Sequence, residues 1–205
     1  VFTEVETDAM LSTGCIMYNA PSRGPNKGNK KVDPRRTAEA RAMVGLGLYA
    51  GLRASEVLGM SWRDIDFDKG TILVQRTAQD GVLEDFTKNY ETRTVPFKSK
   101  LRELLEGLRK QQEGVGRTGD LLFSQEGEKP YFQVQAIFSR VKAQSGMEII
   151  GGFHSFRHTF ATRLANKGAP LTHLQKMLGH SDIKVTMGYV HTSKEDIMRT
   201  ADLMD

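Results

Sequence analysis

Apolar positions along this chain recur mostly at steps of three or four residues, the spacing of helices that bury one face. The clearest case is the stretch 154–165, where Phe156, Phe160 and Leu164 lie four residues apart. We expect Thr37 to cap another helix, since threonine is favoured at that position. The helices predicted besides 154–165 cover residues 2–18, 37–49, 101–111, 131–144 and 170–178.

Between residues 65 and 96 the pattern changes to short runs rich in β-branched residues, which favour strands. Residues 71–77 form the clearest run, and Asp80-Gly81 is a pair typical of hairpin turns. The runs 82–87 and 92–96 can pair with the first. We therefore predict a mainly α fold with a small antiparallel β-sheet, that is, an α+β domain.

Residues 20–36 differ in kind, because prolines and glycines interrupt them and their charge is almost entirely basic. Only Asp33 opposes the basic residues of this segment, which are Arg23, Lys27, Lys30, Lys31, Arg35 and Arg36. We interpret the segment as a basic linker whose side chains are either solvated or lie along phosphates. It would join residues 1–19, the expected end of a preceding domain, to the main domain over 37–192. Residues 193–205 form a polar tail.

The bulk composition indicates a soluble globular protein, with 39% hydrophobic and 26% charged residues among 205. The net charge of +4 leans weakly towards a polyanionic partner. A single cysteine excludes an internal disulfide and fits a reducing cytosol, so we expect a cytoplasmic protein. No apolar run predicts a membrane span. Because the chain opens on Val1 rather than Met, we expect a piece of a longer protein.

The chemistry-bearing residues gather between residues 151 and 191. All five histidines lie there, together with Arg157 and the late tyrosine Tyr189. On a helix, His154 and Arg157 are three positions apart, so their side chains are neighbours. Gly179 ends the helix before His180. A cation, imidazoles and a phenol gathered in this way suit an anionic centre rich in oxygen.

Other kinds of site are less well supported. His154 and His158 have a spacing that can chelate zinc, but no glutamate follows His154 and the nearest carboxylate is distant in sequence. We therefore predict no metal and no other cofactor. Ser155 lacks the glycines that flank an exposed serine nucleophile. The glycines of 114–119 lack the Gly-Lys-Ser/Thr ending of a nucleotide-binding loop.

Tyr189 is the candidate nucleophile. Ionising a phenol at pH 7 costs about 4 kcal/mol, so the reaction needs nearby cations and a proton acceptor. Arg53, Arg157, His154 and His180 can supply both, and arginine grips two phosphate oxygens at once. Taken singly, Tyr189 and Arg53 each have a structural alternative, Tyr189 as a half-buried core residue and Arg53 as the ion-pair partner of Glu56. Lys88, on the tip of a predicted hairpin, has the alternative of a solvated surface residue.

Four motifs in order give the chain a recognisable likeness: GLRASEVLGMSWRDID, TKNYETRTVP, HSFRHTFATRL and LGHSDIKVTMGYVH. With them the sequence resembles the catalytic domain of the tyrosine recombinases, the phage integrase family. The residues that match the family's catalytic positions are Arg53, Lys88, His154, Arg157, His180 and Tyr189. Glu56 matches an acidic position that supports the site.

The resemblance implies a site-specific DNA recombinase or integrase. Tyr189 would attack a DNA phosphate and form a 3′-phosphotyrosyl link, while Arg53, Arg157 and His180 hold the phosphate. Lys88 would protonate the leaving 5′-oxygen, and His154 would assist proton transfer. Neither metal nor ATP is needed.

The implied partners are double-stranded DNA, three further copies in a tetramer, and accessory DNA-bending proteins. The tail 193–205 is the candidate for exchange between subunits, in a bacterial or phage-encoded protein of a mobile element. Two alternatives stay open: a type IB topoisomerase, which cuts one strand as a monomer, and a non-catalytic DNA-binding module.

Overall fold

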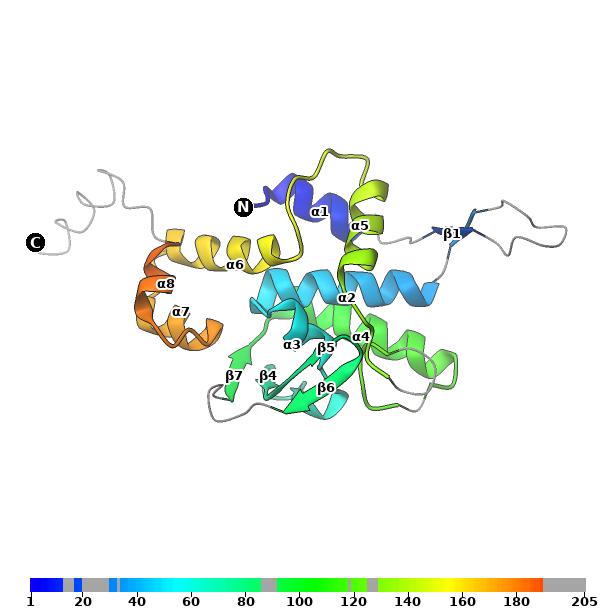
Figure 1. Ribbon diagram of the computed structural model, residues 1–205, viewed down its shortest axis with the longest axis horizontal. Coiled ribbons are helices and arrows are strands. Elements are labelled where there is room, and N and C mark those ends of the chain that lie inside the picture. Colours follow the sequence, from blue (N-terminus) through cyan, green and yellow to red (C-terminus); the bar gives the residue numbers. More distant parts are fainter. Residues whose placement is uncertain are drawn as a thin grey trace, which may run out of the picture.

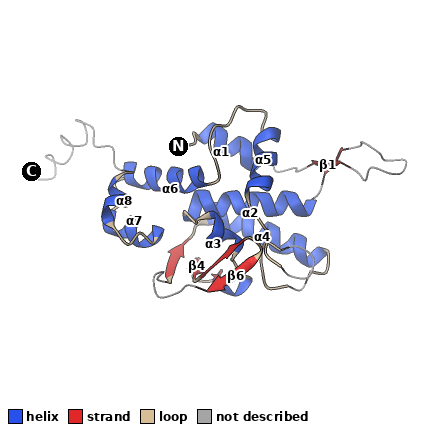
Figure 2. Cartoon of the chain, viewed as in Figure 1, coloured by secondary structure: helices blue, strands red, loops and turns tan. Residues whose placement is uncertain are grey.

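The computed structural model describes residues 1–12, 17–19, 30–32, 34–85, 92–117, 119–124 and 129–189. Helices dominate this part of the chain, and the strands gather mainly at one edge (Figures 1 and 2). The helices are α1 (Glu4–Ser12), α2 (Pro34–Ala50), α3 (Ala54–Leu58), η1 (Trp62–Asp64), α4 (Ser99–Gly114), α5 (Gln135–Gln144), α6 (His154–Asn166), α7 (Leu171–Leu178) and α8 (Ile183–Met187). The strands are β1 (Met17–Asn19), β2 (Lys30–Val32), β3 (Ile65–Asp66), β4 (Thr71–Val74), β5 (Arg76–Gln79), β6 (Val82–Asp85) and β7 (Arg93–Pro96). This architecture confirms the predicted fold class.

The β-structure divides into small antiparallel sheets. In the three-stranded one β4 lies in the middle, so Ile72 pairs with Ile65 of β3 and with Val95 of β7. The β5–β6 hairpin is separate, and the predicted Asp80-Gly81 turn closes it with φ angles of 51° and 77°. Positive φ at both residues is typical of a type I′ turn. The run 71–77 is thus split between β4 and β5, which pair in different sheets.

Helix α2 crosses the middle of the molecule and contacts α1, α4, α5 and α6 (Figure 1). Residues 42–48 are all buried, so this helix is apolar around its whole circumference, as a core helix is. Gly47 allows α6 to come close, because a Cβ there would lie 2.9 Å from Phe156 Cβ. The packing of α6 on α2 fixes the helix that carries Arg157.

The start of α2 differs from the prediction. The helix begins at Pro34, so Thr37 is buried within it and does not cap it. Proline is favoured in a first helical turn, where its missing N–H would lack a helical partner in any case. Arg35 and Arg36, which the prediction assigned to the linker, therefore belong to the helix. Helix α5 likewise begins later than expected, at Gln135.

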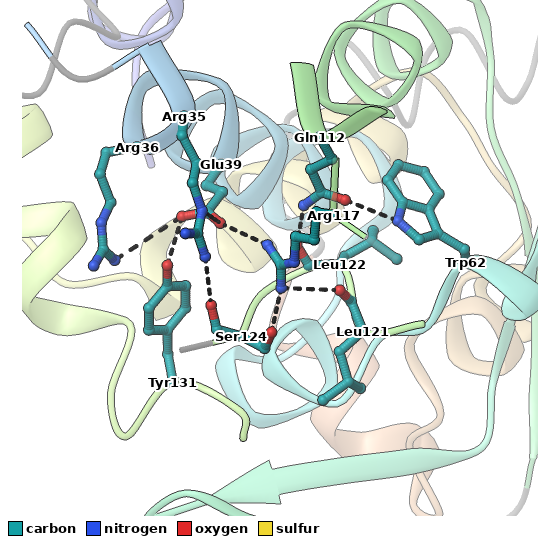
Figure 3. Close-up of polar contacts among 10 residues, drawn as sticks. All are labelled: Arg35, Arg36, Glu39, Trp62, Gln112, Arg117, Leu121, Leu122, Ser124 and Tyr131. Atoms are coloured by element: carbon teal, nitrogen blue, oxygen red, sulfur yellow. Dashed lines mark hydrogen bonds and ion pairs between the residues drawn. The ribbon is translucent and has the colours of Figure 1, made fainter. Parts of the chain in front are cut away.

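Arg35 and Arg36 contact a polar cluster around the Glu39 carboxylate (Figure 3). The Glu39 side chain is 0% exposed and accepts hydrogen bonds from Arg35 Nε, Arg117 Nη1 and the Tyr131 hydroxyl at 3.2, 3.2 and 2.7 Å. Arg36 Nη1 lies 3.9 Å from the carboxylate, and its guanidinium stacks over the Tyr131 ring. A buried carboxylate needs such partners because it has lost its hydration.

The same cluster holds residues 119–124 against α2 and α4. Arg117 donates to the Ser124 hydroxyl and to the Leu121 carbonyl (Figure 3). Gln112 donates to the Leu122 carbonyl at 2.8 Å and accepts from Trp62 Nε1 at 3.0 Å. Arg35 and Arg36 therefore have a structural role, whatever further contact they make.

Within the described ranges, none of the helices has the length and apolar character needed to cross a membrane.

Candidate active site

Glu56 is the centre of the candidate site. Its side chain is 1% exposed, and its carboxylate accepts hydrogen bonds from Arg53 Nη1 at 2.8 Å and from Arg93 Nη1 and Nη2 at 2.9 and 2.7 Å. The Arg53 backbone N–H donates a further bond of 2.8 Å at the start of α3. Arg157 Nη1 lies 4.0 Å away. Burial raises the pKa of Glu56, but the hydrogen bonds and charges of Arg93 and Arg53 outweigh it, so the pKa is below 4.5.

Arg157 projects from α6 and is 1% exposed. Its guanidinium donates to the Gly51 carbonyl at 2.8 Å and to the Leu178 carbonyl at 2.6 Å. It therefore joins the C-terminal end of α2 to that of α7. Burial, together with the neighbouring charge of Arg53, lowers the pKa of Arg157 to about 10, so the side chain stays protonated at pH 7.

Arg53 lies at the boundary before α3, in extended conformation. Besides its bond to Glu56, its Nη2 donates to the Gly179 carbonyl at 3.2 Å, and the side chain is 31% exposed. Gly51, two residues earlier, has φ of 67°, and a Cβ there would lie 2.5 Å from the Phe160 ring. Only glycine suits this position, which brings α2, α3 and α6 together.

His180 follows the left-handed glycine that ends α7. Gly179 has φ of 65°, and Gln175 Nε2 donates to the His180 carbonyl at 3.0 Å. The ring Nδ1 lies 2.9 Å from the hydroxyl of Thr186, which is buried in α8. Burial and the charges of Arg157, Arg53 and Arg93 lower the pKa of His180 to about 4, so the imidazole is neutral at pH 7.

Tyr189 comes directly after α8 and is 7% exposed. Its ring stacks on that of His180 with centroids 6.0 Å apart and planes 10° apart, and it contacts the His158 ring at 5.1 Å. The face of the Tyr189 ring thus packs against His180, another of the catalytic candidates.

His154 begins α6 and is exposed. Although the residue as a whole is exposed, partial desolvation of its imidazole, followed by the charges of Arg157 and Arg53, lowers its pKa from the ordinary histidine value. Its own charge in turn lowers the pKa of His180. The structure thus brings five of the predicted site residues into one cluster, Arg53, Glu56, Arg157, His180 and Tyr189. His154 lies three residues before Arg157 on the same helix.

The remaining predicted residues are less fully described. Lys88 lies outside the described residues, as do Arg23 and Lys27. Lys30 and Lys31 lie in β2, where the backbone alone is described. In the part of the chain that the structure describes, no group of three or more His, Cys, Asp or Glu is placed to hold a metal ion.

Sequence reasoning did not single out Arg93, which makes the shortest ion pair with Glu56. A signal for it exists in the strand pattern. Side chains two apart on a strand share a face, and Arg93 is two residues before Val95, which is fully buried. An arginine on the buried face of a strand requires a buried partner. Thr186 was missed for another reason, since a threonine within a helix does not stand out. His158 was considered only as a zinc ligand, and the structure places its ring against Tyr189.

A family model described as the phage integrase family matches residues 29–196. This chain belongs to the phage integrase family. The likeness carried by the four motifs is thereby confirmed. Among curated relatives, the tyrosine recombinase XerC-like protein of Caldanaerobacter subterraneus subsp. tengcongensis is 30% identical over 176 residues, which are 74% of this chain and 45% of that protein. Tyrosine recombinase XerC of Chlorobaculum tepidum is 30% identical over 202 residues, covering 94% of this chain and 57% of the relative.

The chain thus spans about half the length of the curated relatives it matches. Among solved structures, the Tn1549 transposon integrase in complex with circular intermediate DNA has a TM-score of 0.74 at 22% identity, covering all of this chain and 66% of that one. The XerH site-specific recombinase bound to difH substrate has a TM-score of 0.70 at 21% identity, covering 100% and 54%. The catalytic domain of bacteriophage HP1 integrase has 0.60 at 19% identity, covering 98% and 92%. These likenesses establish the fold.

Proposed function

We propose that this protein is a site-specific DNA recombinase that cuts and rejoins strands through a 3′-phosphotyrosyl intermediate on Tyr189. The observation that carries the proposal is the meeting of Arg53, Arg157 and His180, from three distant parts of the chain, beside that tyrosine. Membership of the phage integrase family supports it. Double-stranded DNA is the proposed partner, and the DNA complexes of the Tn1549 integrase and of XerH support that choice.

The charge of the cluster suits a phosphodiester. Arg53, Arg93 and Arg157 oppose the single carboxylate of Glu56, so the cluster keeps an excess of two positive charges. A phosphodiester has one negative charge and gains another as the tyrosine oxygen attacks. Preorganised cations stabilise that developing charge, and each such donor is worth on the order of 10²–10³ in rate.

The proposed step breaks one bond and forms one. The Tyr189 oxygen attacks phosphorus and loses its proton to His154, while the bond between phosphorus and the 5′-oxygen breaks. The 5′-oxygen takes a proton from Lys88. In this step the neutral His180 accepts a hydrogen bond at Nδ1 from the Thr186 hydroxyl, so its Nε2–H donates to a phosphate oxygen. A 5′-hydroxyl of another strand reverses the step, so neither metal nor ATP is consumed.

The larger assembly is also a proposal. We infer a preceding domain that ends within residues 1–19, a basic linker that lies along DNA, and a tetramer on two duplexes tied by residues 193–205. Accessory DNA-bending proteins and a place on a bacterial or phage mobile element belong to the same proposal. The greater length of the curated relatives supports a further domain. Sedimentation of the protein with its duplex would measure the number of copies.

A covalent-adduct assay tests the central claim. Nuclease protection with the full-length protein first identifies its duplex, and a nicked version of that duplex traps any phosphotyrosyl adduct on a denaturing gel. We expect the parent to give the adduct and Tyr189→Phe to give none. An equal amount of adduct from Tyr189→Phe would refute the nucleophile. A parent that binds the duplex without any adduct would indicate a binding module.

A further inference from the structure

Arg93, the first residue of β7, makes three hydrogen bonds at the site, although one ion pair would neutralise the charge of Glu56. Both of its terminal nitrogens donate to the two Glu56 oxygens, at 2.9 and 2.7 Å. Its Nε donates to the Met177 carbonyl at 2.8 Å. The side chain is 9% exposed, so these bonds are largely shielded from water. One guanidinium therefore connects Glu56 with the last turn of α7.

These contacts form part of a ring that hydrogen bonds and the backbone from Met177 to Gly179 close together. Glu56 binds both Arg93 and Arg53, Arg93 binds the Met177 carbonyl, and Arg53 binds the Gly179 carbonyl. Gly179 completes the ring at close range, since a Cβ there would lie 3.0 Å from Arg93 Nη1 and 3.1 Å from its Cδ. His180 is the next residue. The ring therefore connects Arg53 and His180, which are 127 residues apart in the chain, through Arg93.

We propose that Arg93 is a positioning residue for strand cleavage, which holds Glu56 and the end of α7 so that Arg53 and His180 face the same phosphate. This inference rests on the proposed recombinase function. Arg93 would not touch the DNA, since both ends of its fork are bonded to Glu56. It would act by fixing Arg53 and His180, the two residues that contact the phosphate.

Arginine is required for this role because of its geometry rather than its charge. Its planar fork reaches both carboxylate oxygens while Nε reaches a third acceptor in a different direction. A lysine keeps the positive charge on a single nitrogen and cannot make all three bonds. Arg93→Lys therefore separates positioning from charge neutralisation.

The chain offers a matched control in the neighbouring hairpin. Arg76 of β5 pairs at 2.6 Å with Asp64, whose side chain is 2% exposed, and the arginine is 11% exposed. Arg76→Lys thus weakens a comparable buried ion pair, but one that contains neither Glu56 nor α7. A purely structural role for Arg93 predicts the same result for both variants.

The experiment compares parent, Arg93→Lys and Arg76→Lys on the nicked duplex, measuring DNA dissociation constants and single-turnover cleavage rates at saturating protein. We expect Arg93→Lys to cleave about 50-fold or more slowly, by analogy with the loss of an oriented transition-state donor. Its DNA affinity should stay within about threefold of the parent, because phosphate contacts elsewhere supply most of the binding. Arg76→Lys should cleave at close to the parent rate.

Cleavage by Arg93→Lys that matches Arg76→Lys would overturn the positioning role, and so would equal losses of binding and cleavage. Absence of adduct from the parent would instead overturn the recombinase function itself. If Arg93→Lys does not fold, Arg93→Gln is measured in the same way, since its amide can still donate one bond to Glu56. The same slow cleavage with retained binding is expected, and parent-like cleavage would again overturn the role.

Discussion

Replacing Glu56 with glutamine removes the negative charge from the centre of the arginine cluster while keeping the shape of the side chain. The carboxylate accepts bonds from Arg93 Nη1 and Nη2, from Arg53 Nη1 and from the Arg53 backbone. A glutamine amide has one acceptor oxygen, and its NH₂ group would face N–H donors. The variant therefore loses bonds and brings donors against donors.

The expected cost is about 3–5 kcal/mol in the free energy of unfolding, the range for removing one partner of a buried ion pair. The full range applies because Glu56 is 1% exposed, so solvent screens the pair very little. Urea unfolding of parent and variant at pH 7 measures the difference. Glu84→Gln, at an exposed position of β6, is the control and should change stability by less than about 0.5 kcal/mol.

The dependence on pH gives a second check. The pKa of Glu56 is below 4.5 in the folded protein. A carboxyl whose folded pKa is depressed contributes stability above its unfolded pKa, and this contribution is lost as pH falls through the folded pKa. The difference between parent and variant should therefore be steady near neutral pH and shrink below about pH 4.5. A difference under about 1 kcal/mol at pH 7, or one that grows towards acid pH, would refute the reasoning.

Two further substitutions test the assigned roles. Arg157→Lys should cleave about 10²–10³ times more slowly. It should also lose about 1–3 kcal/mol in the free energy of unfolding, because one of the Gly51 and Leu178 carbonyls loses its donor. Single-turnover rates and urea unfolding measure these two losses, and a parent-like rate would exclude the phosphate contact. Lys88→Ala should cleave an ordinary duplex about 10²–10⁴ more slowly but a duplex with a 5′-bridging sulfur nearly normally, because a thiolate leaves without a proton. Equal slowing on both duplexes would contradict the role of Lys88 as proton donor.

The spacing of residues along the chain predicted the local structure correctly wherever neighbours in sequence are also neighbours in space. His154 and Arg157 lie on one helix, and Gly179 ends α7 with the left-handed conformation that its position predicted. The Asp80-Gly81 turn is of the same kind. Such features depend on backbone preferences of a few residues, so they can be read locally.

Predictions failed where long-range pairs decided the outcome. Arg35 and Arg36 have the composition of a linker, yet α2 extends over them because Glu39, Arg117 and Tyr131 form a buried cluster with them. The predicted strand 71–77 forms two strands instead of one, because β4 pairs with β7 while β5 pairs with β6.

The sequence alone determined the mainly helical class, because helix periodicity and turn residues are local properties. It also determined the family and the catalytic candidates, because these are carried by four short motifs in a fixed order. Tertiary structure alone decided that Arg93 belongs with Glu56, 37 residues away, and that Arg157 bonds to the carbonyl of Gly51, 106 residues away. A buried charge takes whichever partner the packing brings to it. That partner is set by how α2, α6 and α7 fit together, which no local spacing specifies.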